Sequence, residues 1–153
     1  MDPFGRPNPL MAEALLAAEE AAASGEVPVG AVLVNAQGRV LARAANRVET
    51  DHDPTAHAEM LAIRQGAALL GSARLSECDL YVTLEPCAMC AAAIAHARIR
   101  RVYFGASDPK GGGIEHGPRF FEQPTCHHRP EVYGGIGEAA SAALLRRFFR
   151  TRR

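Results

Sequence analysis

The chain has 153 residues, of which 48% are hydrophobic and 22% charged, and 17 basic and 17 acidic residues give a formal net charge of zero. These values are typical of one globular domain and argue against intrinsic disorder as the main theme. They also argue against a membrane span, because no run of about 18 apolar residues is free of charges, and we expect no membrane partner.

The pattern of apolar residues predicts alternating helices and strands after a Pro- and Gly-bearing N-terminal arm at residues 1–8. A helix is expected at 9–24, because small and apolar side chains recur on one helical stripe. The apolar run 28–34 predicts a strand buried on both faces. A turn at 35–38 then leads into a second strand at 39–45.

The rest of the chain continues the alternation, with helices expected to connect successive strands. The helix expected at 87–97 follows Pro86, a residue type suited to the start of a helix. Because crossover helices make their strands parallel, we predict an α/β fold: a three-layer α/β/α sandwich around a mixed sheet, in one domain spanning 9–153. The expected elements are a helix at 57–70, a strand at 79–84, a helix at 87–97, a strand at 101–105, a loop-rich stretch at 106–130, a short strand near 131–133 and a helix at 137–150.

The four cysteines give information on the cellular compartment in which the protein is found. An even count fits disulfides in a secreted protein, but the N-terminus lacks the basic and apolar regions of a signal peptide. Three glutamates within 10–24 also argue against a transit peptide. We therefore expect a cytoplasmic protein with reduced thiols, in which a Cys-x-x-Cys pair indicates metal or redox chemistry.

Two short motifs each fall at the predicted start of a helix: Thr55-Ala-His-Ala-Glu59 and Glu85-Pro-Cys-Ala-Met-Cys90. Two cysteines three residues apart in a first helical turn can reach one point, and the helix N-terminus favours their thiolate form. His57 would supply a third ligand from the facing helix. Three protein ligands with one open position are typical of catalytic zinc, so we predict one Zn²⁺ at His57, Cys87 and Cys90 with water or hydroxide as fourth ligand.

Glu59 lies two residues beyond His57 and is expected beside the metal, where a carboxylate can move a proton from water to a leaving group. The combined motifs match the signature of base deaminases, H-x-E followed by P-C-x-x-C, in which the Glu is the acid/base and not a ligand. A redox cysteine pair and a closed structural zinc site are the alternatives. The fourth ligand of a closed site would come from Cys78, Cys126, His127 or His128.

The sequence resembles the cytidine/deoxycytidylate deaminase superfamily, and within it the bacterial tRNA-specific adenosine deaminases. The zinc motifs are shared across the superfamily, whereas Asp108, Lys110 and the Phe-Phe-Arg ending at 148–150 indicate the tRNA branch. Residues 111–128 depart from the small and aliphatic residues that many members have there. The matching blocks are 26–34, Asn46, 52–59, 80–90, 97–102, 104–110 and 144–150.

The resemblance implies a five-stranded mixed sheet flanked by helices, one zinc per subunit and a homodimer. It also implies hydrolytic deamination of adenosine to inosine at the wobble position, A34, in the anticodon stem-loop of an arginine tRNA, with Glu59 shuttling protons. Aromatic and arginine side chains would flank the RNA. The substrate-binding positions carried over are Asn46, Ala58, Leu84, Pro86, Asp108, Lys110, Phe149, Arg150, Arg152 and Arg153.

The placement of charge bears on the substrate. The final eight residues hold five arginines and no acid, a net of +5, while the first 145 residues hold 12 basic and 17 acidic residues, a net of −5. Such a tail fits a solvated helix end, but it also supplies the local basic patch that one RNA stem-loop requires. Two other functions stay open: a deaminase of free nucleobases or nucleosides of the cytosine or guanine type, and a non-catalytic zinc-stabilised RNA-binding module.

Overall fold

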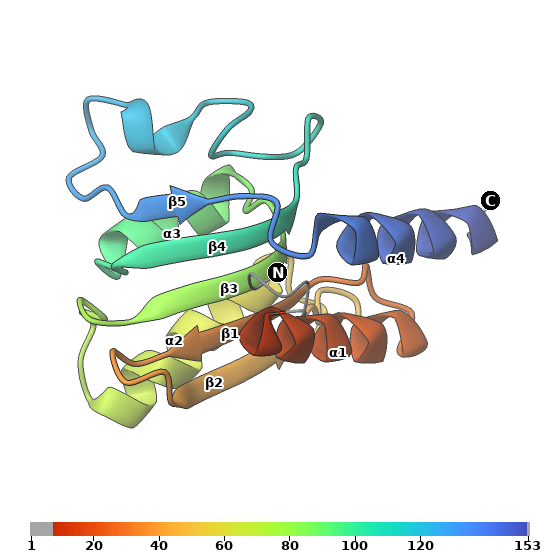
Figure 1. Cartoon of the computed structure of the whole chain (residues 1–153), viewed down its shortest axis with the longest axis horizontal. Helices are drawn as coiled ribbons and strands as arrows, with labels where there is room; N and C mark the ends of the chain where they lie inside the picture. Colours follow the sequence, from red (N-terminus) through yellow and green to blue (C-terminus); the bar gives the residue numbers. More distant parts are fainter. Residues whose placement is uncertain (1–7, 153) are drawn as a thin grey trace.

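The structure, a computed structural model, describes residues 8–152, so most of the predicted arm and Arg153 lie outside the described residues. A sheet lies between two layers of helices (Figure 1). The elements are α1 (Pro9–Ala23), β1 (Gly30–Val34), β2 (Val40–Ala45), α2 (Ala58–Leu70), β3 (Asp79–Leu84), α3 (Ala88–His96), β4 (Arg101–Ala106), the short 3-10 helix η1 (Phe120–Glu122), β5 (Glu131–Tyr133) and α4 (Glu138–Thr151).

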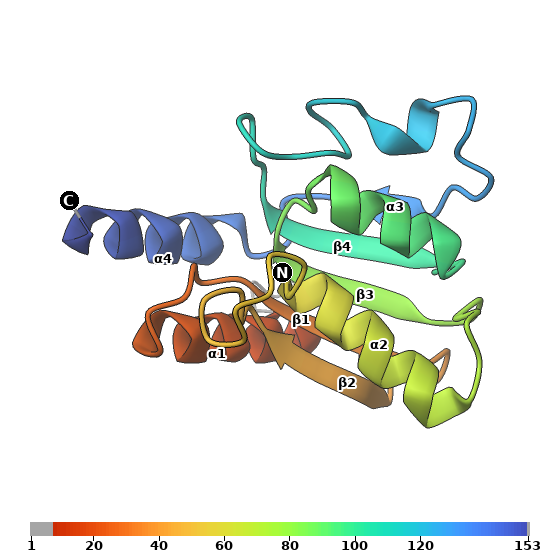
Figure 2. The same ribbon diagram turned by 180° about the vertical axis from the view of Figure 1, so that it is seen from behind.

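The sheet has five strands in the order β2-β1-β3-β4-β5. β1 is antiparallel to both of its neighbours, whereas β3, β4 and β5 run parallel to one another. Helices α1 and α4 cover one face and α2 and α3 the other, as the view from behind makes plain (Figure 2). The three-layer sandwich, the mixed sheet and its parallel later strands are therefore confirmed.

The predicted boundaries differ from the observed ones mostly by a residue or two. The first strand begins at Gly30 rather than at residue 28, because the backbone N–H of Val29 turns back to the carbonyl of Val27. The helix expected at 87–97 begins one residue later, at Ala88, because Cys87 is its N-cap, and Pro86 precedes it as expected. None of the helices between residues 8 and 152 has the length and apolar character that crossing a membrane requires.

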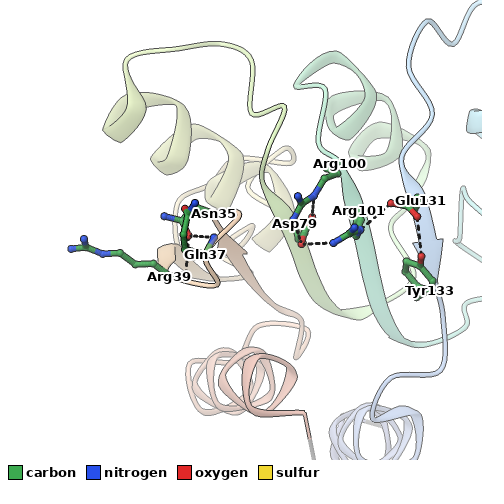
Figure 3. Close-up of polar contacts among 8 residues, drawn as sticks. All are labelled: Asn35, Gln37, Arg39, Asp79, Arg100, Arg101, Glu131 and Tyr133. Carbon is green, nitrogen blue, oxygen red and sulfur yellow. Dashed lines mark hydrogen bonds and ion pairs between the residues drawn. The ribbon is translucent and has the colours of Figure 1, made fainter. Parts of the chain in front are cut away.

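Two opposite edges of the sheet have different characters. At the edge where the three parallel strands begin, Asp79 accepts two hydrogen bonds from Arg100, both of 3.0 Å, and Arg101 pairs with Glu131 at 2.9 Å (Figure 3). Tyr133 donates to the same Glu131 at 3.0 Å. These contacts tie the strand starts together, while β2, β3 and β4 end at the opposite edge, where the first turns of α2 and α3 also lie (Figure 2).

Candidate active site

Three potential metal ligands meet where two helices begin. His57 is the N-cap of α2 and Cys87 the N-cap of α3, and neither side chain caps its own helix. Cys90 is buried in the first turn of α3. The Nδ1 atom of His57 lies 3.6 Å from Sγ of Cys87 and 3.5 Å from Sγ of Cys90. The three side chains therefore point at one another from two neighbouring helices.

These separations fit zinc. With Zn–S near 2.3 Å and Zn–N near 2.1 Å at a tetrahedral angle, a sulfur and a nitrogen bound to one ion stand about 3.6 Å apart. The donor atoms of His57, Cys87 and Cys90 all lie within 4.8 Å of one another, and among residues 8–152 they form the only such group. The side chains considered for a closed site lie elsewhere; His128, for example, binds the carbonyl of Ile99. A site with four protein ligands is therefore not built within these residues.

Electrostatics favour a thiolate at this point even before a metal binds. The hydrogen bond from the Cys90 thiol, together with that from His57, outweighs burial and lowers the pKa of Cys87 to about 4. The same hydrogen bond to Cys87, with burial, raises the pKa of Cys90. The pKa of His57 is raised, chiefly by its hydrogen bond to Cys87. One negative sulfur is thus ready for a cation at neutral pH.

Glu59 lies beside this group in the first turn of α2 and is 4% exposed. Burial raises the pKa of its carboxyl group to about 7. A carboxyl group with a pKa near the working pH is populated in both protonation states, which general acid–base catalysis requires. Glu59 does not belong to the three-residue ligand group, in agreement with a role beside the metal.

A cavity of about 530 Å³ opens over His57, Glu59 and Cys87. Its volume lies within the range of small-molecule sites. Of the predicted substrate-binding residues, the structure places Pro86, Lys110, Phe149 and Arg150 outside the lining. The predicted residues that do line the cavity are Asn46, His57, Ala58, Glu59, Leu84, Cys87, Asp108 and Arg152.

Asn46 offers the cavity a free hydrogen-bond acceptor. Its Nδ2 atom donates to the carbonyl of Val27 at 3.3 Å, but its buried Oδ1 atom has no partner. An unpaired buried acceptor is costly unless a ligand or water satisfies it. The side chain is thus suited to receive an N–H or O–H group of a bound molecule.

The C-terminal helix reaches the mouth of the cavity. Phe148 and Arg152 line it, and the Arg152 guanidinium stands 4.5 Å from the centre of the Phe148 ring. Phe149, the aromatic residue expected to contact RNA, is half exposed and packs edge-on against Phe148. The residues alone did not distinguish Phe148 from Phe149, and only the resemblance indicated Phe149. The orientation of α4 places the Phe148 ring at the cavity instead.

Residues 6–106 match the family described as "Cytidine and deoxycytidylate deaminase zinc-binding region". The chain belongs to this family. It is 59% identical to a tRNA-specific adenosine deaminase of Agrobacterium fabrum over 92% of this chain and 91% of that protein. It is 47% identical to one of Rickettsia bellii, over 92% and 97% respectively.

A solved structure from work on A-to-I editing by tRNA:A34 deaminases at the wobble position superposes with a TM-score of 0.87. Its sequence is 58% identical, and the match covers 89% of this chain and 98% of that chain. The fold and the zinc-binding region of this deaminase are therefore those of its relatives, and the three-ligand group occupies the region after which the family is described.

Two buried acidic residues of this deaminase were missed by the sequence reasoning. Glu26 and Glu85 both line the cavity, and both are at most 2% exposed. Burial alone would raise their pKa values, but hydrogen bonds from backbone N–H groups and side chains outweigh it and lower both pKa values. One feature of the sequence could have indicated them: each glutamate stands next to an apolar strand segment. Both belong to motifs used for the resemblance, and neither was given a role of its own.

Proposed function

We propose that this chain catalyses the zinc-dependent hydrolytic deamination of adenosine to inosine at the wobble position, A34, of tRNA. The observation that carries the proposal is the ligand group of His57, Cys87 and Cys90 beside the buried Glu59, because His57, Cys87 and Glu59 line a nucleoside-sized cavity. The relatives that share most of the chain's length and carry the tRNA-specific adenosine deaminase name support the substrate.

The three donors would hold one zinc ion through one imidazole nitrogen and two sulfurs. When bound, zinc supplies a Lewis acid that lowers the pKa of a water molecule in the coordination position the protein leaves open. The helix N-termini at Ala58 and Ala88 support this role, because their partial positive charge stabilises the anionic ligand set.

Glu59 would move the protons. Its carboxylate takes a proton from the attacking water and passes it to the amino group that leaves as ammonia. Water thereby supplies the oxygen of inosine, and the bond from C6 of the purine to the amino nitrogen breaks. The pKa of about 7 suits a group that must accept and donate within one turnover.

Substrate recognition would combine the cavity and its rim. A base in a stacked anticodon loop is out of reach, so it must be splayed out and inserted between the apolar walls, which include Val29 and Leu84. The unpartnered Oδ1 atom of Asn46 would accept a hydrogen bond from the nucleotide. Arg152 and Phe148, at the mouth, would contact the backbone and a neighbouring base, and Asp108, which also lines the cavity, would contact the nucleotide chain.

The test is an assay on an anticodon stem-loop. Purified protein with zinc should convert A34 of an arginine-tRNA stem-loop to inosine, leave a G34 stem-loop unchanged, and turn over free adenosine, cytidine and guanine far more slowly. Absence of inosine in the A34 stem-loop would refute the proposal. Efficient turnover of a free base would instead identify a nucleobase deaminase, and zinc binding without any turnover a non-catalytic module.

The proposal includes a homodimer. Apolar side chains on α2 and α3 stay partly exposed on the layer that faces away from α1 and α4: Met60, Ile63, Met89, Ala92 and Ala93. Neighbouring apolar groups left in water are typical of a subunit interface. Sedimentation equilibrium should give twice the chain mass, and Ile63→Arg should shift the population to monomers. A wild-type protein that sediments as a monomer at assay concentration would contradict it.

We also propose a cytoplasmic location and one catalytic domain over 9–153. All four cysteines are free thiols, as a reducing compartment would keep them. The tRNA substrate would be found in the same compartment. Fractionation of cells that carry a tagged chain should recover it with cytoplasmic markers, and recovery with the membrane or secreted fraction would contradict this location.

A further inference from the structure

The loop that follows β4 is held by one buried side chain, Glu85. Its Oε1 atom accepts a hydrogen bond from the backbone N–H of Asp108 at 3.0 Å. Its Oε2 atom accepts three more, from the backbone N–H groups of Ile114, Glu115 and His116, at 3.0 to 3.2 Å. One carboxylate thus joins the first part of the loop, which lines the cavity, to a segment six to eight residues later.

His116 completes this arrangement from its side chain. Its Nδ1 atom lies 2.8 Å from Oε1 of Glu85, so the ring N–H donates to the oxygen that also receives the Asp108 N–H. Backbone and ring of His116 therefore hold both oxygens of the same carboxylate. A charged acceptor with several well-directed donors is a strong anchor in a buried place.

The glycine run within the loop, at 111–113, allows this close approach. A Cβ atom on Gly112 would lie 2.2 Å from Oε2 of Glu85, and one on Gly113 would lie 2.5 Å from the backbone N of Ala88. The N–H of Gly113 also donates to the carbonyl of Pro86 at 2.8 Å. The loop thus packs directly on the backbone that carries Cys87, and side chains at these positions would push it away.

Asp108 is the residue that this arrangement places. Its own Oδ1 atom accepts the N–H groups of Lys110 and Gly111, which turns the chain at the rim. Asp108, Gly111 and Arg152 all line the cavity. Any shift of the Glu85 anchor would therefore move the rim toward or away from the substrate.

We propose that Glu85 and His116 are positioning residues that set the place of Asp108 at the rim, and thereby how tightly the enzyme holds the nucleotide chain around its target base. The inference rests on the proposed function for the identity of the substrate. Since the rim touches the substrate in its ground state as well as in the transition state, its loss should raise KM and leave kcat nearly unchanged.

The sharpest variants are at His116, outside the zinc ligands and their neighbours in sequence. His116→Asn keeps an N–H donor at the position of Nδ1, while His116→Leu removes it at similar volume. We expect His116→Leu to raise KM for the A34 stem-loop about tenfold or more with kcat within about threefold, and His116→Asn to restore most of the affinity. Zinc content should be one ion per chain in both.

His128→Leu is the matched control. His128 also makes one side-chain hydrogen bond, to the carbonyl of Ile99 at 2.7 Å, but it does not line the cavity. Its loss should lower thermal stability without changing KM. Hydrogen exchange gives a readout independent of activity: the amides of Asp108, Ile114 and Glu115 should exchange faster in His116→Leu and at the wild-type rate in His128→Leu.

The inference is overturned if His116→Leu leaves KM and the exchange of these amides unchanged, or if His116→Asn fails to differ from His116→Leu. Glu85→Gln provides a second check, because it weakens the acceptor for all five donors and should exceed His116→Leu in both readouts. A wild-type protein inactive on the stem-loop would refute the proposed function alone, and faster amide exchange in His116→Leu would still support the anchor.

Discussion

The zinc-ligand group and the rim of the cavity are built in different ways. The ligand group uses the first turns of two helices, so each motif carries its side chains to the right place within a few residues. The loops of the rim, at 49–50 and 108–116, contain no helix or strand. Each is held by a buried carboxylate that lies far from it in the sequence. Glu26 accepts hydrogen bonds from the backbone N–H groups of 49–50, just as Glu85 accepts them from the 108–116 segment.

This difference divides the expected effects of mutation. The helical ends present groups that act on the reacting atoms, so changes there should reduce kcat or abolish metal binding. The rim presents groups that hold the substrate in place, so changes there should act mainly on KM. Variants of each region therefore test whether chemistry and recognition are separable in this protein.

The largest effect is expected from Cys87→Ala. The variant removes the sulfur with the lowest pKa in the ligand group, so zinc should be lost and deamination with it. Metal analysis of the purified variant checks this. Cys78→Ala, which alters a buried thiol outside the ligand group, is the control and should keep one zinc ion per chain. Full zinc occupancy in Cys87→Ala would show that the ligand assignment is wrong.

Glu59→Gln should come next. The amide keeps the size of the side chain but cannot carry the proton, so kcat should fall by about 10²–10⁴-fold while zinc remains bound. Single-turnover assays with metal analysis measure both quantities. If kcat stays within a small factor of the wild type, another group must move the protons and the role given to Glu59 is wrong.

A smaller effect is expected from the arginines of α4 and the residue that follows it. Replacing Arg146, Arg147, Arg150 and Arg152 by Gln removes the local basic patch, so KM for the stem-loop should rise by roughly tenfold and its dependence on salt should weaken. The exposed Arg39 and Arg74, replaced in the same way, serve as a control. An unchanged salt dependence would separate this helix from RNA binding.

The smallest expected effect is on stability at acid pH. Hydrogen bonds hold the pKa values of Glu26 and Glu85 below their ordinary range in the folded chain, so their ionised forms stabilise the fold above the unfolded pKa. This contribution is lost as the pH falls through the folded pKa, below about 4.5. Glu26→Gln should therefore be less stable at pH 7 and lose less stability between pH 5 and 3. Urea unfolding at several pH values measures this, and parallel losses would contradict it.

The sequence alone predicted the sandwich well, because the strand at Gly30–Val34 is continuously apolar and the helices between the strands have clear starts. It also located the three residues of the ligand group, and Glu59 beside them, since two cysteines three residues apart lie close together within one helical turn. Its one-residue difference at the start of α3 has a local cause: Cys87 is the N-cap, and its extended backbone precedes the first helical residue.

The tertiary structure decided the rest. Which of two adjacent phenylalanines faces the cavity depends on how α4 docks, and no local pattern distinguishes Phe148 from Phe149. The contact between Glu85 and His116 joins residues 31 apart, through a loop whose path depends on glycines packed against another helix. The sequence thus determined the catalytic groups, because helical geometry is local. Folding determined the rim, because buried carboxylates bind whichever donors the packed chain brings to them.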